Sequence, residues 1–268
     1  MKSEFDNLLK EYNRLKIVQS KQQFDELKQQ FVYHSNKLEG SNLTLIQTKD
    51  VVNYHKIKGE ASIVDILMVI DHYRALNQAL YFGANNYPLT EKLVLNLDEI
   101  LLKNTFEIDP FYQSWKTKGQ KLGCYKVMSN RIKYTVNEQT VFYETPTPQK
   151  SKEILITALE NYQNSADNFI DKLSKLIQNI YNAHPFFDGN KRMTRLIVAN
   201  QLMASNLPLI PIPFNKGKYN KALIEGFINQ TNLPIKNEIE AVFNQFLAKQ
   251  IEDKLNTKQP NKGFGLIL

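Results

Sequence analysis

The fold is decided by one stretch of twelve residues, His184-Pro185-Phe186-Phe187-Asp188-Gly189-Asn190-Lys191-Arg192-Met193-Thr194-Arg195. Apolar residues recur at helical spacing over 151–182, and Pro185 pushes the residue before it out of the helical conformation. Gly189 permits backbone angles that are closed to other residues, and a second helix is expected over about 191–204. The stretch therefore predicts a polar loop that joins two helices, with Phe186 filling the core beneath it.

This loop has the features of an anion-binding site. The first backbone amides of the helix after Gly189 lack partners inside the helix and carry partial positive charge, which suits a phosphate group. Lys191, Arg192 and Arg195 add full positive charges. Arg192 and Arg195 are three residues apart, so they share a helix face that suits neighbouring phosphates.

A carboxylate and an imidazole complete the set. Asp188 would repel a phosphate unless a magnesium ion lay between them, since magnesium favours carboxylate and phosphate oxygens. His184 can accept a proton near pH 7. An ordinary helix cap with a surface histidine explains any one of these residues, but it does not explain the ordered set. The sequence has no glycine-rich Walker-type loop, so a triphosphate would have to be held by other means.

The rest of the chain predicts an all-α fold with one β-hairpin. Helices are also expected over about 4–38, 62–82, 90–104, 217–229 and 235–255, with a loose tail over 256–268. Gly40 ends the first of these helices, and Thr44 with Gln47 forms a capping-box pattern that opens a further helix. Residues 135–143 favour strand, with Asn137-Glu138-Gln139 as the turn.

Composition limits the class of protein. The 268 residues suit one sizeable domain, and 42% hydrophobic residues are enough for a core. No apolar run approaches the roughly 18 to 20 residues that span a bilayer, and the first residues lack the apolar stretch of a signal peptide. The single cysteine, Cys124, excludes an internal disulfide. We therefore expect a reduced, cytoplasmic protein with no membrane partner, and the richness in Lys, Asn and Ile suggests a bacterial source.

The charge is basic, at +7 from 34 Lys and Arg against 27 Asp and Glu. Such a balance attracts the phosphates of nucleotides or nucleic acid, although a lysine-rich solvated surface is the simpler explanation. The stretch 110–137 stands apart, because it has six basic residues and no acidic one. If this stretch borders a site, it favours an anionic ligand.

The stretch 184–195 resembles the Fic motif, H-x-F-x-D/E-G-N-G/K-R-x-x-R, at every specified position. The resemblance extends over roughly residues 30 to 230. It implies a Fic-type helical bundle with a short β-hairpin flap, and transfer of AMP from Mg-ATP to a Ser, Thr or Tyr hydroxyl of a target protein. Catalysis would come mainly from positioning and charge stabilisation, as in phosphoryl transfer generally.

The same resemblance assigns roles to the motif residues. His184 deprotonates the target hydroxyl as the catalytic base, and Asp188 holds Mg2+, the expected cofactor. The residues assigned to ATP are Gly189, Asn190, Lys191, Arg192, Arg195 and Tyr219.

The ATP-binding residues are expected along the triphosphate. Gly189 and Asn190 meet the α-phosphate region. Arg192 holds the β-phosphate, and Arg195 reaches the γ-phosphate. Tyr219 resembles a family tyrosine near the nucleotide, and the alternative is a tyrosine packed within its helix.

A looser resemblance covers the hairpin region, about 123–145. Gly123-Cys124-Tyr125-Lys126 resembles the start of the flap, along which a segment of the target protein lies as an added strand. Lys126 stands where arginine is common, and Thr145-Pro146-Thr147-Pro148 replaces a proline run. A plain structural hairpin is the alternative. Self-modification is a further expectation, because the chain has 13 tyrosines and a homodimer would present one chain to another.

A second informative stretch is Ser35-Asn36-Lys37-Leu38-Glu39-Gly40. Ser35 and Glu39 are four residues apart and share a helix face, and alone they would be ordinary surface residues. The stretch resembles the inhibitory pattern S/T-x-x-x-E-G/N of the Fic family, in the class II arrangement where the inhibitory helix precedes the core. The resemblance implies that Glu39 pairs with Arg195, which removes the γ-phosphate clasp and makes the enzyme autoinhibited.

These observations divide the chain into three parts. Residues 1–85 are an N-terminal helical region with the inhibitory motif. Residues 86–230 are the Fic core with its flap and its motif. Residues 231–268 are a C-terminal helix and a loose tail.

Three other functions stay open. The Doc branch of the family carries lysine at the position of Lys191 and transfers phosphate instead, although Gly189, Arg195 and the Ser35–Glu39 pattern fit AMP transfer better. Removal of AMP, with Glu39 activating water, is the second. The third is a basic helical module that binds a partner or nucleic acid through an inactive site. The intact motif argues against it, so no nucleic acid is expected.

Overall fold

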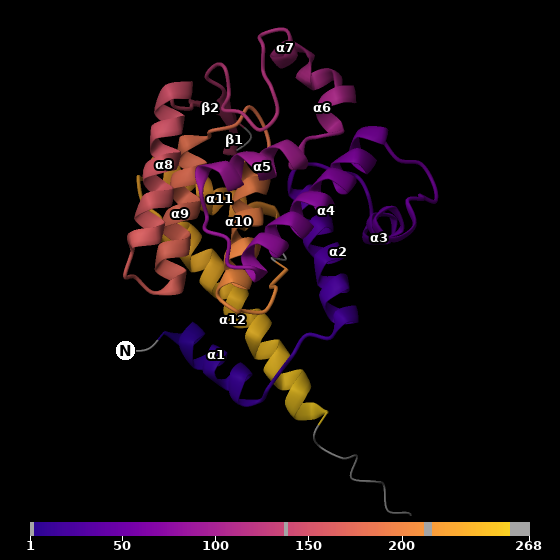
Figure 1. The fold of residues 1–268 in the computed structure, drawn as a ribbon, viewed down its shortest axis with the longest axis vertical. Coiled ribbons are helices and arrows are strands. Elements are labelled where there is room, and N and C mark those ends of the chain that lie inside the picture. Colours follow the sequence, from indigo (N-terminus) through magenta and orange to yellow (C-terminus); the bar gives the residue numbers. More distant parts are fainter. Residues whose placement is uncertain (1–2, 137–138, 212–215, 258–268) are drawn as a thin grey trace, which may run out of the picture.

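The computed structural model describes residues 3–136, 139–211 and 216–257. Within these ranges almost all regular structure is helical, and the strands form one antiparallel hairpin, so the all-α prediction is confirmed (Figure 1). The helices are α1 (Glu4–Arg14), α2 (Lys21–Leu38), α3 (Leu45–Tyr54), α4 (Ile63–Ala84), α5 (Glu91–Leu101), α6 (Thr105–Ile108), the 3-10 helix η1 (Pro110–Tyr112), α7 (Gln113–Lys116), α8 (Pro148–Asn164), α9 (Phe169–Ala183), α10 (Asn190–Ala204), α11 (Lys216–Ile228) and α12 (Leu233–Asn256). The strands are β1 (Arg131–Val136) and β2 (Gln139–Glu144).

Polar caps begin several helices where the sequence predicts them. Thr44 and Gln47 form the predicted capping box at the start of α3. Ser62 caps α4 by accepting a hydrogen bond from the backbone of Val64. Gly40, just after α2, has a φ of 98°, a left-handed conformation that suits glycine. These local signals explain why the predicted end of α2 and the predicted start of α4 agree with the observed ones to within one residue.

Helix α10 lies at the centre of the molecule (Figure 1), and it is buried on two sides. Leu196 belongs to a hydrophobic cluster shared with α4 and α5, whereas Val198 belongs to one shared with α9, α11 and α12. At Gly83 on α4 the two helices approach so closely that an added Cβ atom would lie 2.2 Å from the backbone oxygen of Asn200. The core therefore fixes the helix that carries the second half of the motif.

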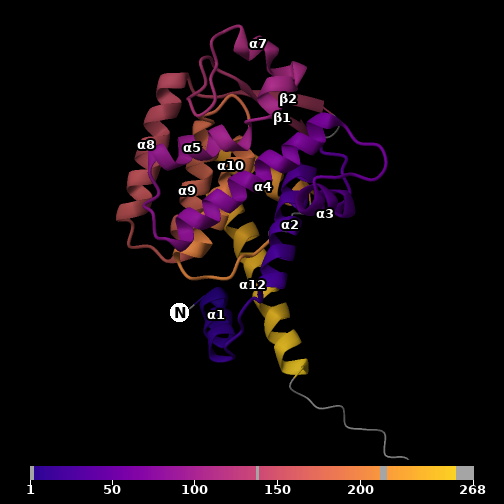
Figure 2. The same cartoon turned by 45° about the vertical axis from the view of Figure 1, so that its right-hand side comes forward.

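The first and last helices pack together. α1 lies against α12 in both views (Figure 1 and Figure 2). The rings of Phe5 on α1 and Phe243 on α12 have centroids 6.0 Å apart. α2 packs on α4, where Asn36 Oδ1 lies 2.7 Å from Nδ1 of the buried His72. The helix that leads to Glu39 is thus held to the core.

The predicted hairpin is present as β1 and β2. Arg131 stands opposite Glu144, and Tyr134 stands opposite Val141. Positions 137 and 138 of the predicted turn lie outside the described residues. The first strand starts later than the predicted flap region, because 123–130 form a loop that leads into β1.

Two predicted helices are each divided in the structure. The predicted helix over 4–38 is interrupted after α1, and Ser20 caps the start of α2. The predicted helix over 151–182 is interrupted after α8, and Asn168 caps the start of α9. In both cases a polar cap residue starts a new helix inside a continuous apolar pattern. The short elements α6, η1 and α7 were not predicted at all.

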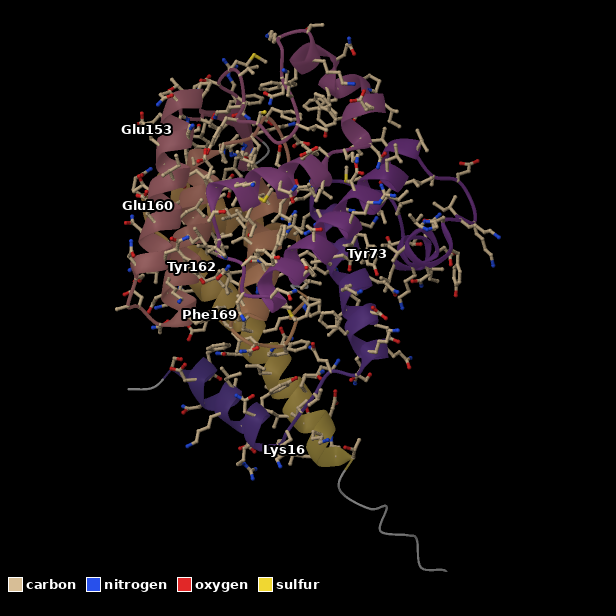
Figure 3. The ribbon with its side chains drawn as sticks, in the orientation of Figure 1. Lys16, Tyr73, Glu153, Glu160, Tyr162 and Phe169 are labelled. Atoms are coloured by element: carbon tan, nitrogen blue, oxygen red, sulfur yellow. The ribbon has the colours of Figure 1, made fainter. Side chains whose placement is uncertain are left out.

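Helix α8 separates its polar and apolar sides clearly. Glu153 and Glu160 lie on its outer side (Figure 3), where both are exposed. Tyr162 on the same helix is buried and donates its hydroxyl hydrogen to Gln201 Oε1 at 2.8 Å. Across the described ranges, the helices are all too short or too polar to cross a bilayer.

Candidate functional site

The motif forms a tight loop between α9 and α10. His184 ends α9 in the left-handed conformation with a φ of 45°, and Gly189 opens α10 with a φ of 76°. The side chain of Asn190 closes the loop, since its Oδ1 accepts from the Phe186 amide at 3.0 Å and its Nδ2 donates to the Phe186 carbonyl at 2.8 Å. Phe186 is fully buried, as predicted, so the loop is anchored in the core.

One pocket of about 570 Å³ opens beside this loop. The predicted site residues that line it are Glu39, His184, Asp188, Gly189, Asn190 and Lys191. The hairpin base contributes Asn130, Arg131 and Glu144, and the unpredicted segment before it contributes Phe111 and Trp115. The pocket therefore brings together the inhibitory segment, the hairpin and the motif, which are far apart in the sequence.

His184 is placed to act as a proton acceptor. Its ring Nδ1 lies 3.4 Å from the backbone oxygen of Tyr181, which can only accept a hydrogen bond. This contact places the ring proton on Nδ1 and leaves a lone pair on Nε2. Burial, reinforced by the positive charge of Lys126, lowers the pKa of His184 to about 4. The imidazole is therefore neutral at pH 7.

Asp188 is bonded by two buried side chains. Its Oδ2 accepts from the Tyr112 hydroxyl at 2.6 Å and from Arg192 Nη2 at 2.9 Å. The side chain of Arg192 is 3% exposed, whereas that of Asp188 is 37% exposed and lines the pocket. Sequence reasoning missed Tyr112, because it stands in an irregular segment with no periodic pattern.

Glu39 is held by two cations. Its Oε1 lies 2.6 Å from Arg195 Nη2, the pair that the resemblance implies, and its Oε2 lies 3.1 Å from Lys191 Nζ. Ser35 Oγ accepts from Arg195 Nε at 2.6 Å. Burial would raise the pKa of Glu39, but the positive charges of Lys191 and Arg195 outweigh it and lower the pKa to about 2. The stabilisation by this carboxylate is therefore complete above the ordinary pKa of 4.5 and is lost progressively as the pH falls from there to about 2.

The two arginines of α10 have unused hydrogen-bonding capacity. Arg192 and Arg195 are 2% and 1% exposed. Arg192 Nε and Nη1 and Arg195 Nη1 are buried without a hydrogen-bond partner among the described residues. Unpaired buried donors are costly, but neither arginine is among the residues that line the pocket, so their contact with ATP remains a prediction.

Tyr219 lies beside Arg195 in the core. Its hydroxyl is 2.9 Å from Thr194 Oγ1, and the guanidinium carbon of Arg195 lies 5.7 Å from its ring centroid. Tyr219 is fully buried and is not among the residues that line the pocket. Its contact with ATP remains a prediction.

The hairpin base is tied to the motif loop. Asn130 Nδ2 donates to the backbone oxygens of Phe186 and Phe187 at 3.1 and 3.2 Å. The backbone amide of Lys126 donates to the Pro185 oxygen at 2.9 Å. The start of the hairpin is therefore positioned directly against the loop that carries His184.

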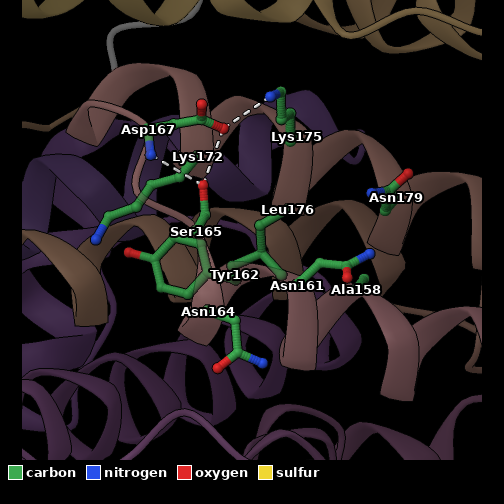
Figure 4. A pocket seen from close by; sticks show the side chains of 10 residues that line it. All are labelled: Ala158, Asn161, Tyr162, Asn164, Ser165, Asp167, Lys172, Lys175, Leu176 and Asn179. Carbon is green, nitrogen blue, oxygen red and sulfur yellow. Dashed lines mark hydrogen bonds and ion pairs between the residues drawn. The ribbon is translucent and has the colours of Figure 1, made fainter.

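A second hollow lies between the end of α8 and the start of α9 (Figure 4), with a volume of about 390 Å³. Its polar side chains bond one another, since Asp167 Oδ2 accepts from Lys175 at 2.7 Å and from Ser165 at 2.9 Å. No motif residue lines this hollow, so it is separate from the candidate site.

Comparison with known proteins points to one family. Residues 88–202 match the model of the Fic/DOC family. The chain is 26% identical over 188 residues to the protein adenylyltransferase Fic of Drosophila virilis, covering 69% of this chain and 34% of the relative. The corresponding protein of Drosophila mojavensis is 25% identical over 188 residues, covering 69% and 33%. The chain thus spans about a third of the length of the curated relatives it matches.

Solved structures share the fold. A Fic domain containing signaling protein from Bacteroides thetaiotaomicron superposes with a TM-score of 0.80 at 23% identity, covering 97% of this chain and 100% of that one. A Fic family protein from Desulfovibrio desulfuricans gives a TM-score of 0.74 at 16% identity, covering 97% and 77%. With the complete motif at the head of α10 and the hairpin beside it, these matches show that residues 88–202 of the chain are a Fic/DOC family region.

Proposed function

We propose that this chain is a protein adenylyltransferase that transfers AMP from Mg-ATP to a hydroxyl of a target protein, and that Glu39 holds it inactive. The observation that carries the proposal is the single pocket in which a neutral His184, the Asp188 carboxylate and the amide end of α10 meet. The adenylyltransferase names of the relatives support the reaction type.

The proposed reaction is an in-line displacement. Nε2 of His184 takes the proton of the target hydroxyl as its oxygen attacks the α-phosphorus of ATP. The bond from that phosphorus to the bridging oxygen breaks, and pyrophosphate leaves. Arg192 and Arg195 would bind the β- and γ-phosphates, and the first amides of α10 would face the α-phosphate.

The residues of the pocket fit a magnesium ion with Asp188 as its protein ligand. Both donors to this carboxylate bond Oδ2, and Oδ1 has no donor among the described residues. The described ranges hold no group of three or more His, Cys, Asp or Glu side chains suited to a metal. One carboxylate with phosphate oxygens and waters is an ordinary magnesium site. When bound, Mg2+ would neutralise phosphate charge during the transfer.

The base predicts an unusual pH profile. In a Glu39→Gly chain, kcat/KM should stay constant from pH 8 down to about pH 5, and it should fall only as the pH approaches the His184 pKa of about 4. The rate falls at low pH because protonation removes the lone pair of His184 that accepts the proton. Burial and the charges of Lys126 and Lys191 lower the pKa of His184, whereas the charge of Asp188 raises it by less. Initial rates in a constant-ionic-strength buffer series measure the profile. A midpoint near the ordinary value of 6.5 would contradict this environment for the base.

A labelling experiment tests the proposed reaction. The Glu39→Gly chain is incubated with magnesium, a bacterial lysate and ATP labelled at the α- or the γ-phosphate. Label on protein from the α-position alone, with AMP identified on the target by mass spectrometry, supports adenylyl transfer. Label from the γ-position would overturn it in favour of Doc-like phosphate transfer, which the lysine at position 191 keeps as the second candidate.

The hairpin is the proposed docking surface for the target. A target segment that pairs with it as an added strand would lie next to His184, because Asn130 at the hairpin base bonds the motif loop. Arg131 and Glu144 at the open end of the strands line the pocket. We also propose that the chain forms a homodimer in which one copy modifies the other.

A further inference from the structure

We infer that Tyr112 is a positioning residue that keeps the Asp188 carboxylate available to a divalent cation. The inference rests on the proposed function, because the cation it concerns is the magnesium of Mg-ATP. Tyr112 belongs to η1, between α5 and the hairpin, and no part of the sequence motif includes it.

The hydrogen-bond geometry gives Tyr112 this role. Its hydroxyl and Arg192 Nη2 both donate to Oδ2 of Asp188, at 2.6 and 2.9 Å. Arginine has several donors in a planar fork and readily binds both oxygens of a carboxylate. With the tyrosine on Oδ2, the carboxylate is turned so that Oδ1 stays without a donor among the described residues. Without Tyr112, Oδ2 would keep one donor, Arg192, and the carboxylate could rotate into a two-oxygen pair with that guanidinium.

Tyr112 is also suited to be a permanent donor. Tyr112 is 3% exposed, and its hydroxyl donates to Asp188 Oδ2 from within the core. A neutral donor orients the carboxylate without adding a charge that would repel a cation.

The segment that leads to Tyr112 is anchored at its start. The buried carboxylate of Asp71 on α4 accepts from the backbone amides of Asn104 and Thr105 at 2.8 and 2.9 Å. The Asn104 amide group and the Thr105 hydroxyl donate to the same carboxylate at 2.6 and 3.1 Å. The ring of Tyr112 then packs edge-on against Phe187 of the motif, with centroids 5.4 Å apart. The hydroxyl is thus held in place before any ligand binds.

Direct metal binding tests the inference. Tyr112→Phe is made in the Glu39→Gly chain, and Mn2+ binding in the presence of the non-hydrolysable α,β-methylene analogue of ATP is followed by electron paramagnetic resonance. Binding of the analogue without metal is followed in EDTA by the fluorescence of Trp115, the single tryptophan, which lines the pocket. Tyr125→Phe is the matched control, because it removes a tyrosine–carboxylate bond, to Glu91 at 2.8 Å, outside the pocket.

We expect Tyr112→Phe to raise the Mn2+ dissociation constant about 10-fold, at the lower end of the usual range for a partner of a metal ligand. Metal-free binding of the analogue should be unchanged, and Tyr125→Phe should match the parent in both measurements. If the Glu39→Gly parent transfers AMP and Tyr112→Phe binds Mn2+ as tightly as that parent, the inference is overturned and the proposed function stands. An equal loss of metal-free binding would also overturn it, since the role would then be structural. A parent that binds neither Mn2+ nor nucleotide would overturn the proposed function as well.

Discussion

Replacing Glu39 by glycine is expected to raise the rate of AMP transfer by about 5- to 150-fold, the usual range for coupling between two sites. The reason is that Glu39 occupies Arg195 Nη2 at 2.6 Å and Lys191 Nζ at 3.1 Å, two cations proposed to meet the triphosphate. Glu39 is the C-cap of α2, so a glycine there keeps the helix itself intact. Initial rates of label incorporation from α-labelled ATP, for wild type and variant, measure the effect.

Graded variants separate release of the cations from general loosening. Glu39→Gln keeps the length of the side chain but removes the negative charge that holds Arg195 and Lys191, and it is expected to raise the rate less than Glu39→Gly. Glu39→Gly should also lower the melting temperature, because it leaves Arg195 buried without its carboxylate, and Mg-ATP should restore that temperature. Equal rates for wild type and Glu39→Gly would show that Glu39 does not inhibit.

Removing the base has the second large expected effect. In the Glu39→Gly background, His184→Ala should lower the rate of AMP transfer by about 10²- to 10⁴-fold, the usual contribution of a general base. The affinity for Mg-ATP should stay unchanged, because the imidazole is proposed to bind the target hydroxyl's proton and no phosphate. Single-turnover rates and calorimetric titration with the α,β-methylene analogue measure the two quantities.

The conformation of His184 calls for a second variant. With a φ of 45°, this position is strained for alanine, whereas asparagine tolerates the left-handed region well. His184→Asn is therefore expected to lose the same activity while keeping the loop in place. If His184→Asn retained the rate of its parent, His184 would not be the base. A loss of nucleotide affinity in both variants would instead mean that the loop had moved.

The sequence was most informative in the motif, where residues with restricted or unusual backbone conformations stand among the polar residues of the site. Pro185 and Gly189 mark the ends of the motif loop, so its place between two helices was predictable from their conformational limits alone. The pairing of Glu39 with Arg195 was implied only by resemblance, and the bond from Arg195 to Ser35 was not predicted. Both partners lie more than 150 positions from Arg195 in the sequence, so no local pattern indicates the contacts.

Other features were hidden from the sequence for physical reasons. The breaks before Lys21 and Phe169 depend on single cap residues that compete with a continuous apolar pattern. Tyr112 bonds Asp188 from a segment whose start is anchored by Asp71 on a different helix. Lys191 was expected at the nucleotide, and its bond to Glu39 depends on where α2 ends relative to α10. Such contacts follow from tertiary packing, which no local pattern records.

The place of Glu39 at the end of α2 also bears on the kinetics of the proposed inhibition. The helix is fixed by buried residues such as Phe31 and Val32, whereas the Glu39 side chain is 17% exposed and lines the pocket. Opening then needs the bonds of Glu39 to Arg195 and Lys191 to break and one side chain to rotate, without movement of the helix, and local motions of this kind take nanoseconds to microseconds. Turnover in phosphoryl transfer is typically about 1–100 per second. The blocked and open forms would therefore exchange many times per turnover, and activity would follow the ATP concentration of the moment, without a lag.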